Sequence, residues 1–348
     1  MDTLTHALSG ALLARATAPK DAPPRSLPRR IAAGFFAAAA PDLDFILGYA
    51  GPVAYLEQHR GVTHSLILLP FWALLFSWIL AKILREPRGW RAVYGITALG
   101  LAAHIAGDWI TGFGTMMLSP LSTWRAALGT TFIIDLWFTG IIFAGLLLSL
   151  LFRKSRWPAV AAGVVLGGYV AFQYVQLQKA IAFGEEYARI QGIKGAVVSA
   201  HARPASPFNW TVFVSDADAH RFAHVNLVRR EPRRYQPGDG FLAKVDSPYL
   251  PRDQAAWVTR TRYGYAPVTG LGREAWNSSA LGFFRWFADV PAFDGTTEGA
   301  TCFWFSDLRF LTPGRDALPF RFGACRDASN ASWRAFERVG ETGRQPLD

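Results

Sequence analysis

The sequence predicts an α-helical membrane domain over residues 1–178, with five or six transmembrane or half-inserted helices, and a small β-rich extracytoplasmic domain over residues 179–348. Three observations predict this. Hydrophobic residues make up 51% of the chain and charged residues 18%, whereas soluble domains carry about 25% charged residues. Long apolar runs alternate with short polar loops between residues 31 and 177. Beyond Lys179, short β-favouring runs are separated by Pro, Gly and Asp.

Residues 3–18 form the first predicted helix. Acidic Asp2 precedes its apolar stretch, and a secretory signal peptide requires a basic region there, so we expect the helix to be retained. The helix is shorter than the about 20 residues that span the hydrocarbon core of a bilayer. It therefore crosses with a tilt, inserts halfway, or packs against its neighbours.

Further apolar segments follow at residues 31–49, 62–84, 92–113, 130–152 and 157–177. The segment 62–84 is the clearest predicted span, because a helix rises 1.5 Å per residue and about 20 apolar residues cover the core. The segment 31–49 is interrupted by Pro-Asp-Leu-Asp at residues 41–44. After the last segment, residues 210–214, 223–228, 303–305 and 308–310 are predicted strands.

Basic residues in the loops predict the orientation. They concentrate in alternate loops, at residues 19–30, 85–91 and 153–156, which must therefore lie on one side. The positive-inside rule makes this side cytoplasmic. We predict a multi-pass protein of the bacterial cytoplasmic (inner) membrane, with residues 51–60, 114–129 and the whole C-terminal domain outside.

The net charge of +10 would suggest a nucleic-acid partner in a soluble protein. Here the basic loops account for much of it, so no nucleic acid is predicted. Arginine is also common in the C-terminal domain, and this leaves anionic membrane lipid or another acidic partner open. Oligomeric state is not indicated by the sequence.

Histidines and aspartates gather at the outward ends of the predicted helices. The candidate metal ligands are His6, Asp42, Asp44, His59, His64, His104, Asp108 and Asp135. An orientation derived only from Lys and Arg places them all at one depth, provided that the first helix crosses, whereas random placement would scatter them. Ionisable groups at membrane depth are costly and usually functional, so the sequence predicts one site.

The spacing of these residues decides which of them can meet. His104 and Asp108, at i and i+4, share one helix face, which suits two ligands of one metal; a polar contact between helices is the alternative. His59 and His64 would diverge by about 140° on a continuous helix. Both reach one site only if His59 lies in the preceding loop or the helix starts near Gly61.

The remaining candidates have alternative roles. Pro41 makes an extended or restarting backbone plausible, so both Asp42 and Asp44 can reach the site, or one binds metal while the other caps a helix. Asp135 is a lone carboxylate that needs a partner, which a metal or a metal-bound histidine would provide. Arg60 suits a phosphate or carboxylate; the alternative is an arginine that snorkels to the interface. His6 taken alone is the weakest candidate, because a lone histidine on an apolar helix is more often a packing residue.

Histidine and carboxylate ligands bind divalent metals, with zinc favoured and manganese or iron also suited. One to three ions would fit this set. A bound metal lowers the pKa of its water to about 7, which predicts hydrolysis, most naturally of a phosphoester in a lipid or lipid-linked substrate at the outer face. We assign catalytic roles to Asp44, Arg60 and Asp135, an aspartate unused by metal serving as general base and Arg60 contacting phosphate.

Two alternatives to a hydrolase remain. One is a non-catalytic membrane protein with a structural metal site and a partner-binding C-terminal domain. The other is a transporter, which would need its ionisable groups spread across the membrane. In the C-terminal domain, Cys302 and Cys325 form either a disulfide or two buried thiols, and His201, His220 and His224 are expected to be structural or surface residues.

Several motifs resemble one known family. They are Asp-Thr-Leu-Thr-His at residues 2–6, Pro-Asp-Leu-Asp at 41–44, His-Arg-Gly-Val-Thr-His-Ser at 59–65 and His-Ile-Ala-Gly-Asp at 104–108. Together with Thr111–Thr115 and Asp135, they resemble the YdjM-type membrane-bound metal-dependent hydrolases over roughly the first 150 residues. Residues 305–310 resemble the extracytoplasmic extension of some members. The resemblance implies a membrane-bound, metal-dependent hydrolase.

The order of the ligands resembles, more remotely, that of zinc-dependent phospholipase C and P1-type nucleases. This likeness implies a metal cluster that cleaves phosphoesters, with ligands at His6, Asp42 or Asp44, His59, His64, His104 and Asp108. It implies little about the substrate.

Overall fold

The structure, a computed structural model, describes residues 1–19, 26–297, 301–314, 318–326, 332–340 and 343–347. The chain divides into two compact units. The first contains Met1–Ile46 and Gln58–Leu177, and the second contains Leu47–Glu57 and Gln178–Asp348. The predicted domain boundary after residue 178 falls inside a continuous helix rather than in a loop.

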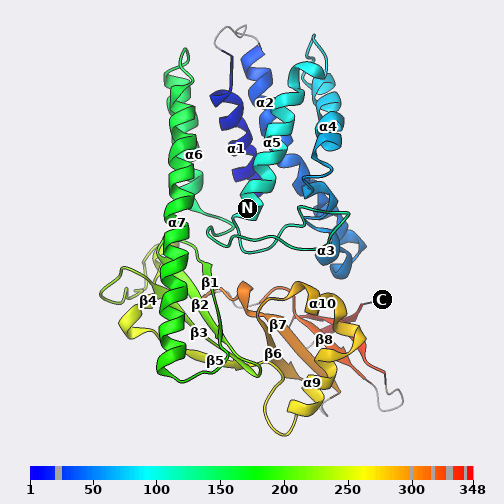
Figure 1. Ribbon diagram of the computed structural model, residues 1–348, viewed down its shortest axis with the longest axis vertical. Helices are drawn as coiled ribbons and strands as arrows, with labels where there is room; N and C mark the ends of the chain where they lie inside the picture. The colour runs from blue at the N-terminus through cyan, green and yellow to red at the C-terminus, as the bar shows by residue number, and fades with distance from the viewer. Residues whose placement is uncertain (20–25, 298–300, 315–317, 327–331, 341–342, 348) are drawn as a thin grey trace. The chain divides into compact units, whose positions relative to one another are not determined.

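The first unit is helical (Figure 1). Its helices are α1 (Thr3–Ala16), α2 (Ser26–Ala39), α4 (Leu69–Ile83), α5 (Arg91–Trp109), α6 (Leu136–Leu151) and α7 (Trp157–Ile190), the last of which continues into the second unit. Short elements connect α2 to α4: the 3-10 segment η1 (Ala40–Ala50), α3 (Pro52–Gln58) and the 3-10 turn η2 (Val62–His64). The helical nature of the N-terminal half is thus confirmed.

Within the described residues, two helical stretches are long and apolar enough to cross a membrane, Ser26–Ala50 and Trp157–Ile190. A third span is obtained if the broken pair Pro52–His64 and Leu69–Ile83 is counted as one. This pair is bent by 82°, so residues 62–84, the clearest predicted span, form a 3-10 turn followed by α4 rather than one straight helix. The break occurs at Ser65, whose hydroxyl accepts from the backbone N–H groups of Ile67 and Leu68 and donates to the Ser119 carbonyl.

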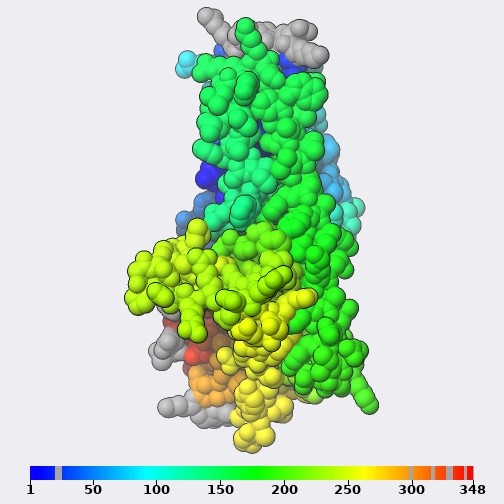
Figure 2. All heavy atoms as spheres, turned by 90° about the vertical axis from the view of Figure 1, so that its left-hand side faces the viewer, coloured from blue at the N-terminus to red at the C-terminus, as the bar shows by residue number. Residues whose placement is uncertain are grey.

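The α6 and α7 helices form one face of the first unit (Figure 2). Large apolar side chains are exposed along both helices, including Phe143 and Leu151 on α6 and Val164 and Val165 on α7. A soluble protein rarely leaves so many such side chains in water, whereas lipid tails accept them. This face therefore has the surface of a membrane protein.

Small residues allow the helices α1, α2 and α5 to approach closely. A Cβ atom on Gly10 of α1 would lie 2.0 Å from the carbonyl oxygen of Gly34 on α2. A Cβ atom on Gly34 would lie 2.5 Å from the Gly10 carbonyl, and one on Gly100 of α5 would lie 3.1 Å from the Gly34 carbonyl. Backbone contact of this kind is typical of helices packed in membranes. These backbone contacts hold α1 and α2 side by side and place α2 against α5.

The C-terminal end of α1, the N-terminal end of α2 and the α6–α7 connection lie at the other end of the first unit from the histidine-bearing start of α1 (Figure 1). Arg15 donates to the carbonyls of Arg153 and Ser155, at 2.8 and 2.6 Å, and Arg156 donates to the Ala18 carbonyl. These hydrogen bonds join the end of α1 to the α6–α7 connection. The α4–α5 connection lies at the same end (Figure 1).

The second unit is rich in β-strands. Its first sheet contains β1 (Val197–Ala202), β2 (Asn209–Ser215), β3 (Ala219–Asn226) and β4 (Leu250–Pro251) in that order, with β5 (Val258–Thr261) also paired to β3. The second sheet has the order β10 (Gly343–Pro346), β9 (Arg334–Val339), β8 (Phe322–Cys325), β7 (Cys302–Asp307), β6 (Pro291–Thr296). The helix α8 (Phe241–Asp246) lies between β3 and β4 of the first sheet, and α9 (Thr269–Asn277) and α10 (Gly282–Phe287) lie between the two sheets in the sequence. The β-rich prediction is confirmed.

Apolar side chains and a disulfide hold the second unit together. Phe213 and Phe222 of the first sheet pack against Val290, Ala292 and Leu308. Cys302 and Cys325 face each other on β7 and β8 and form a disulfide, which decides between the two alternatives left by the sequence. The predicted strand at residues 308–310 is instead a 3-10 turn, because the Asp307 carboxylate accepts from the Arg309 N–H and starts the turn.

We expect the second unit to lose stability as the pH falls below 6.5, because His220 is buried in the neutral state. Its Nε2 donates to the Pro291 carbonyl and its Nδ1 accepts from the Ser215 hydroxyl, both at 2.7 Å. Burial is the main cause that lowers the pKa of His220 to about 4. The unfolded chain therefore binds a proton between pH 6.5 and 4 that the folded domain excludes, and this costs about 1.4 kcal/mol per pH unit.

Hydrogen exchange of the β2 and β3 amides in the detergent-solubilised protein measures this stability. His220→Gln keeps a donor but cannot titrate, so its stability should fall less steeply over the same pH range. Equal slopes for the wild type and this variant would contradict the assignment to His220.

Candidate metal centre

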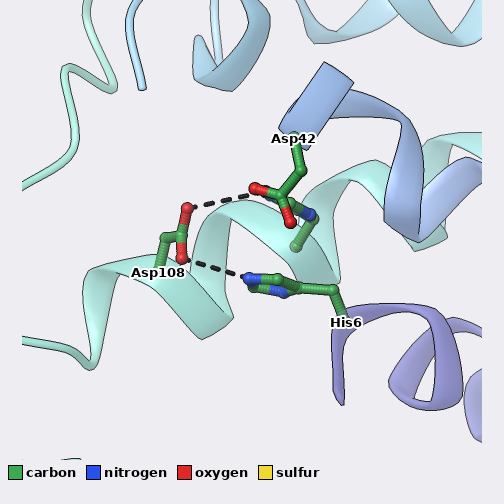
Figure 3. Close-up of side chains that lie close together, drawn as sticks. His6, Asp42 and Asp108 are labelled. Atoms are coloured by element: carbon green, nitrogen blue, oxygen red, sulfur yellow. Dashed lines mark hydrogen bonds and ion pairs between the residues drawn. The ribbon is translucent and has the colours of Figure 1, made fainter. Parts of the chain in front are cut away.

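Four side chains converge at the end of the first unit opposite the basic loops. They come from three elements: His6 from α1, Asp42 from η1, and His104 and Asp108 from α5. One potential ligand atom from each lies within 4.8 Å of the others. Figure 3 shows His6, Asp42 and Asp108 pointing toward one another. The i, i+4 spacing of His104 and Asp108 places both on the inner face of α5, as the sequence predicts.

His64 reaches the same cluster from the break before α4. Its Nε2 lies 2.8 Å from Nε2 of His104, 3.1 Å from Oδ2 of Asp108 and 4.0 Å from Oδ1 of Asp42. The 3-10 turn that carries His64 starts after Gly61, where a Cβ atom would lie 2.7 Å from the Gln58 carbonyl. The predicted start near Gly61 is therefore present as a 3-10 turn, which glycine permits, whereas α4 itself begins at Leu69. We call these five residues the His/Asp cluster.

Hydrogen bonds on the far side of each ring assign the tautomers of His64 and His104. Nδ1 of His104 lies 2.6 Å from the Ala38 carbonyl, which can only accept, so Nδ1 carries the proton. The Thr63 hydroxyl donates to Asp44, and its oxygen is then the acceptor for Nδ1 of His64 at 2.9 Å. In the neutral state, each ring therefore presents the bare lone pair of Nε2 to the cluster.

The cluster therefore brings several hydrogen-bond acceptors together without donors between them. Two Nε2 lone pairs face each other at 2.8 Å, and carboxylate oxygens of Asp42 and Asp108 lie 3.1 to 4.0 Å from them. Oδ2 of Asp42 and Oδ2 of Asp108 are buried without a hydrogen-bond partner. Such an arrangement is repulsive unless a cation lies among the atoms, and histidine and carboxylate ligands suit a divalent metal. These residues therefore fit a metal ion, of a type that the donor set leaves open.

The two oxygens of Asp108 have different surroundings. Oδ1 accepts from Arg60 Nη2 at 3.0 Å and from the α-amino group of Met1, and it lies 3.1 Å from Nε2 of His6. Oδ2 faces the lone pairs of His64 and His104. The first oxygen thus holds the carboxylate in place through Arg60 and the Met1 amine, and the second is free to act as a metal ligand.

Asp44 lies behind the cluster. Its Oδ1 accepts from Nδ1 of His59 at 2.7 Å, and its Oδ2 accepts from the Arg60 N–H and the Thr63 hydroxyl. Through Thr63, Asp44 orients His64. Asp44 and His59 are therefore not among the converging ligand atoms, and the sequence alone could not separate Asp42 from Asp44.

Arg60 is buried, with 2% of its surface exposed, so it does not snorkel. It contacts Asp108, donates to the Thr111 hydroxyl at 3.1 Å, and lies over the Phe113 ring at 4.8 Å. Its Nε is buried without a hydrogen-bond partner. Its φ of 61° is unusual for a side chain with a Cβ atom. The Arg60 N–H to Asp44 bond and the Met116 N–H to Arg60 carbonyl bond hold this conformation.

Residues 1–180 of the 348 match the family model described as YdjM inner membrane protein. The chain belongs to the YdjM inner membrane protein family. The matched region contains every residue of the His/Asp cluster. Membership also supports a location in the inner membrane.

A relative in Bacillus subtilis (strain 168), described as "Uncharacterized protein YfhP", is 30% identical over 90 residues. The match covers 26% of this chain and 27% of the relative, so the chain spans only about a quarter of that protein. No solved structure matches the chain.

In this YdjM-family protein, Asp135 takes a different role from the predicted metal ligand. It is the N-cap of α6, and its Oδ1 accepts from the N–H groups of Trp137 and Phe138 at 2.9 Å. Its Oδ2 accepts from the Tyr169 hydroxyl at 2.9 Å. Both oxygens are occupied by these partners. An aspartate immediately before an apolar run is a common helix-start signal, which could have indicated the cap.

Asp135→Ala is therefore expected to leave the metal content of the YdjM-family protein unchanged. It should destabilise α6 by about 1 kcal/mol, as loss of a helix cap does. Elemental analysis and thermal unfolding of the detergent-purified variant measure the two effects. Asp135→Asn, which can still accept at the cap, serves as the control; a loss of metal in both variants would instead favour a ligand role.

Proposed function

We propose that the protein is an integral-membrane, metal-dependent hydrolase that cleaves a phosphoester in a lipid or lipid-linked substrate. The observation that carries this proposal is the convergence of the unprotonated Nε2 atoms of His64 and His104 on Asp42 and Asp108. Zinc matches this mixed donor set well, and manganese and iron are alternatives. When bound, the metal would activate a water molecule and polarise the phosphoester.

The residues around the site would bind the metal, orient its ligands and contact the substrate. Asp42, His64, His104 and Asp108 would hold the metal, with His6 stacked on the His104 ring at 3.7 Å. Asp44 and the Ala38 carbonyl fix the orientation of the two imidazoles. The Arg60 guanidinium forms an ion pair with Asp108, and its Nε, which has no hydrogen-bond partner, would donate to an anionic substrate oxygen.

Apolar side chains near the ligands support a lipid substrate. Leu43, Phe45 and Ile46 are exposed on η1, the segment that carries Asp42. Leu118, Leu121 and Trp124 are exposed in the loop between α5 and α6. Two hydrogen bonds join this loop to the residues that follow His64: Leu66 N–H donates to the Met117 carbonyl, and the Ser65 hydroxyl donates to the Ser119 carbonyl. Such side chains favour a bilayer interface over water, and lipid headgroups are found there.

We further propose that five or six helices cross or enter the bilayer, with the His/Asp cluster and the C-terminal domain on the extracytoplasmic side. The end of α1 and the basic α6–α7 connection lie at the same end of the first unit (Figure 1). By the positive-inside rule this end would be cytoplasmic, which supports the proposed orientation. The Cys302–Cys325 disulfide also supports it, because disulfides persist outside the cytoplasm.

The test combines metal analysis with hydrolysis by the detergent-purified protein. We expect stoichiometric divalent metal, and metal-dependent cleavage of bis(p-nitrophenyl) phosphate or dispersed phosphatidylglycerol. His64→Ala should lose the metal and reduce hydrolysis by at least about a hundredfold. His59→Gln is the matched control, because it lies five residues away and keeps a donor for Asp44. Protein that lacks divalent metal, or hydrolysis that survives His64→Ala, would refute the proposal.

The burial of the cluster favours a second candidate, a structural metal site. His64, His104 and Asp108 are fully buried, and only the Asp42 side chain, 13% exposed, keeps contact with solvent. Structural zinc sites are closed in this way, whereas catalytic sites keep an open position. A stoichiometric metal that resists exchange, without any hydrolysis of the two phosphoesters, would favour this candidate.

A further inference from the structure

A row of polar side chains crosses the first sheet of the second unit. His201 of β1 is paired with Thr211 of β2, and Thr211 is paired with His224 of β3, so the three side chains lie on one face. The next pair on that face is Phe213 and Phe222, which pack in the apolar layer between the two sheets. The polar row therefore borders a dry interior.

Arg203 follows His201 by two residues and lies against this row. Its Nε donates to the Thr211 hydroxyl at 2.5 Å, and its Nη1 donates to the Arg309 carbonyl at 3.0 Å. Only 5% of its surface is exposed. Both partners are neutral, and within the described part of the chain no carboxylate forms an ion pair with Arg203.

The nearest acidic groups are occupied by other arginines. Asp307 forms an ion pair with Arg309 at 2.7 Å, and Asp246 forms ion pairs with Arg229 and Arg233. A buried charge without a counter-ion is strongly unfavourable. Arg203 therefore gives the interior of the second unit a positive charge that its hydrogen bonds do not neutralise.

Three buried polar atoms around this charge have no hydrogen-bond partner. They are Nη2 of Arg203, Nε2 of His201 and the Tyr249 hydroxyl oxygen. Tyr249 is fully buried, and its ring lies edge-on to His224 at 5.8 Å. Burial, with the Arg203 and Arg309 charges, lowers the pKa of His201 to about 3, so its ring is neutral and has one N–H to donate. Native proteins rarely leave several buried donors unpartnered in one place.

We propose that Arg203, His201, Thr211, His224 and Tyr249 form a binding site for a small oxyanion. A phosphate or carboxylate group supplies what the site lacks: a negative charge for Arg203 and oxygen acceptors for the Nη2, Nε2 and hydroxyl donors. The site is separate from the His/Asp cluster and requires no metal. It makes the C-terminal domain a ligand-binding module that recognises an anionic group.

Hydrogen exchange of the full-length protein in detergent tests the site. EDTA is added so that phosphate cannot bind through a metal ion. Exchange rates in phosphate are compared with those in chloride at equal ionic strength and pH 7. We expect phosphate to slow exchange saturably in β1, β2 and β3. A parallel experiment with acetate distinguishes a site for planar carboxylates from a site for tetrahedral phosphates. Only the anion whose shape fits the site should slow amide exchange at low concentration.

Tyr249→Phe is the decisive variant, because the hydroxyl that it removes has no protein partner. Its exchange without anion should match that of the wild type, while its anion affinity should fall about tenfold or more. Arg203→Gln should abolish the response, and Tyr235→Phe, at an exposed tyrosine, is the control. Equal protection by chloride and both oxyanions, or wild-type affinity in Tyr249→Phe, would overturn the proposal even if Arg203→Gln failed to fold.

Discussion

Asp108→Asn is expected to remove the metal and to destabilise the first unit by about 3–5 kcal/mol. The substitution preserves the shape of the side chain but removes its charge. Arg60, which is 2% exposed and lies 3.0 Å from Oδ1, then becomes a buried cation without a carboxylate partner. The oxygen that faces His64 and His104 also becomes a weaker metal ligand. Elemental analysis and thermal unfolding of the detergent-purified variant measure the two losses.

A double variant separates these effects. Asp108→Asn combined with Arg60→Met removes both members of the ion pair, and replacing a whole buried pair costs far less than breaking one. We therefore expect most of the lost stability to return, while the metal remains absent. Recovery of metal together with stability would show that Asp108 acts only as a counter-ion for Arg60.

Gly10→Val is expected to weaken metal binding about 10–100-fold, although it replaces none of the ligand residues. A Cβ atom on Gly10 would lie 2.0 Å from the Gly34 carbonyl and 2.6 Å from Cβ of Ala38. The Ala38 carbonyl fixes Nδ1 of His104 at 2.6 Å, so a displaced α2 turns this imidazole away from the cluster. Overpacking of this kind also costs about 1–3 kcal/mol of stability. Competition with a chelating dye measures the metal affinity.

Gly140→Val on α6 is the matched control. It introduces the same side chain into a helix of the same unit, but a Cβ atom there meets nothing within 4 Å. Its metal affinity should equal that of the wild type. If Gly10→Val also retained wild-type affinity, the close packing of α1 on α2 would not be what holds His104 in position.

Local spacing predicted the part of the site that one helix carries. His104 and Asp108 needed only helical geometry, and the loop charges placed them at the same end as His64. The distinction between Asp42 and Asp44 depended on the 3-10 conformation of η1, which directs one carboxylate to the cluster and the other to His59. Hydropathy could not reveal the break after His64, because the Ser119 carbonyl that holds Ser65 comes from a distant loop.

In the second unit, too, the sequence predicted local elements but not the contacts between distant residues. Alternating β-favouring residues predicted strands near β2, β3 and β7, where the pattern is local. The disulfide required the register of β7 against β8, and the Arg203 row required the register of three strands. Pairing between strands is a long-range property that residue order alone does not determine. The position of Asp135 directly before an apolar run also matched a helix cap, which is where the structure places it. Its roles as a metal ligand and a catalytic group stay predictions.

The long sequence separations within the His/Asp cluster have a consequence for biosynthesis. His6 and Asp108 lie 102 residues apart, and His104 lies 66 residues from the carbonyl that orients it. A chain is synthesised from its N-terminus, so α1, η1 and the His64 turn are made before α5 exists. The cluster cannot form until α5 has joined α1 and α2. Metal loading would therefore report that α5 has joined α1, α2 and the His64 turn, and a chain that ends before α5 would lack the site.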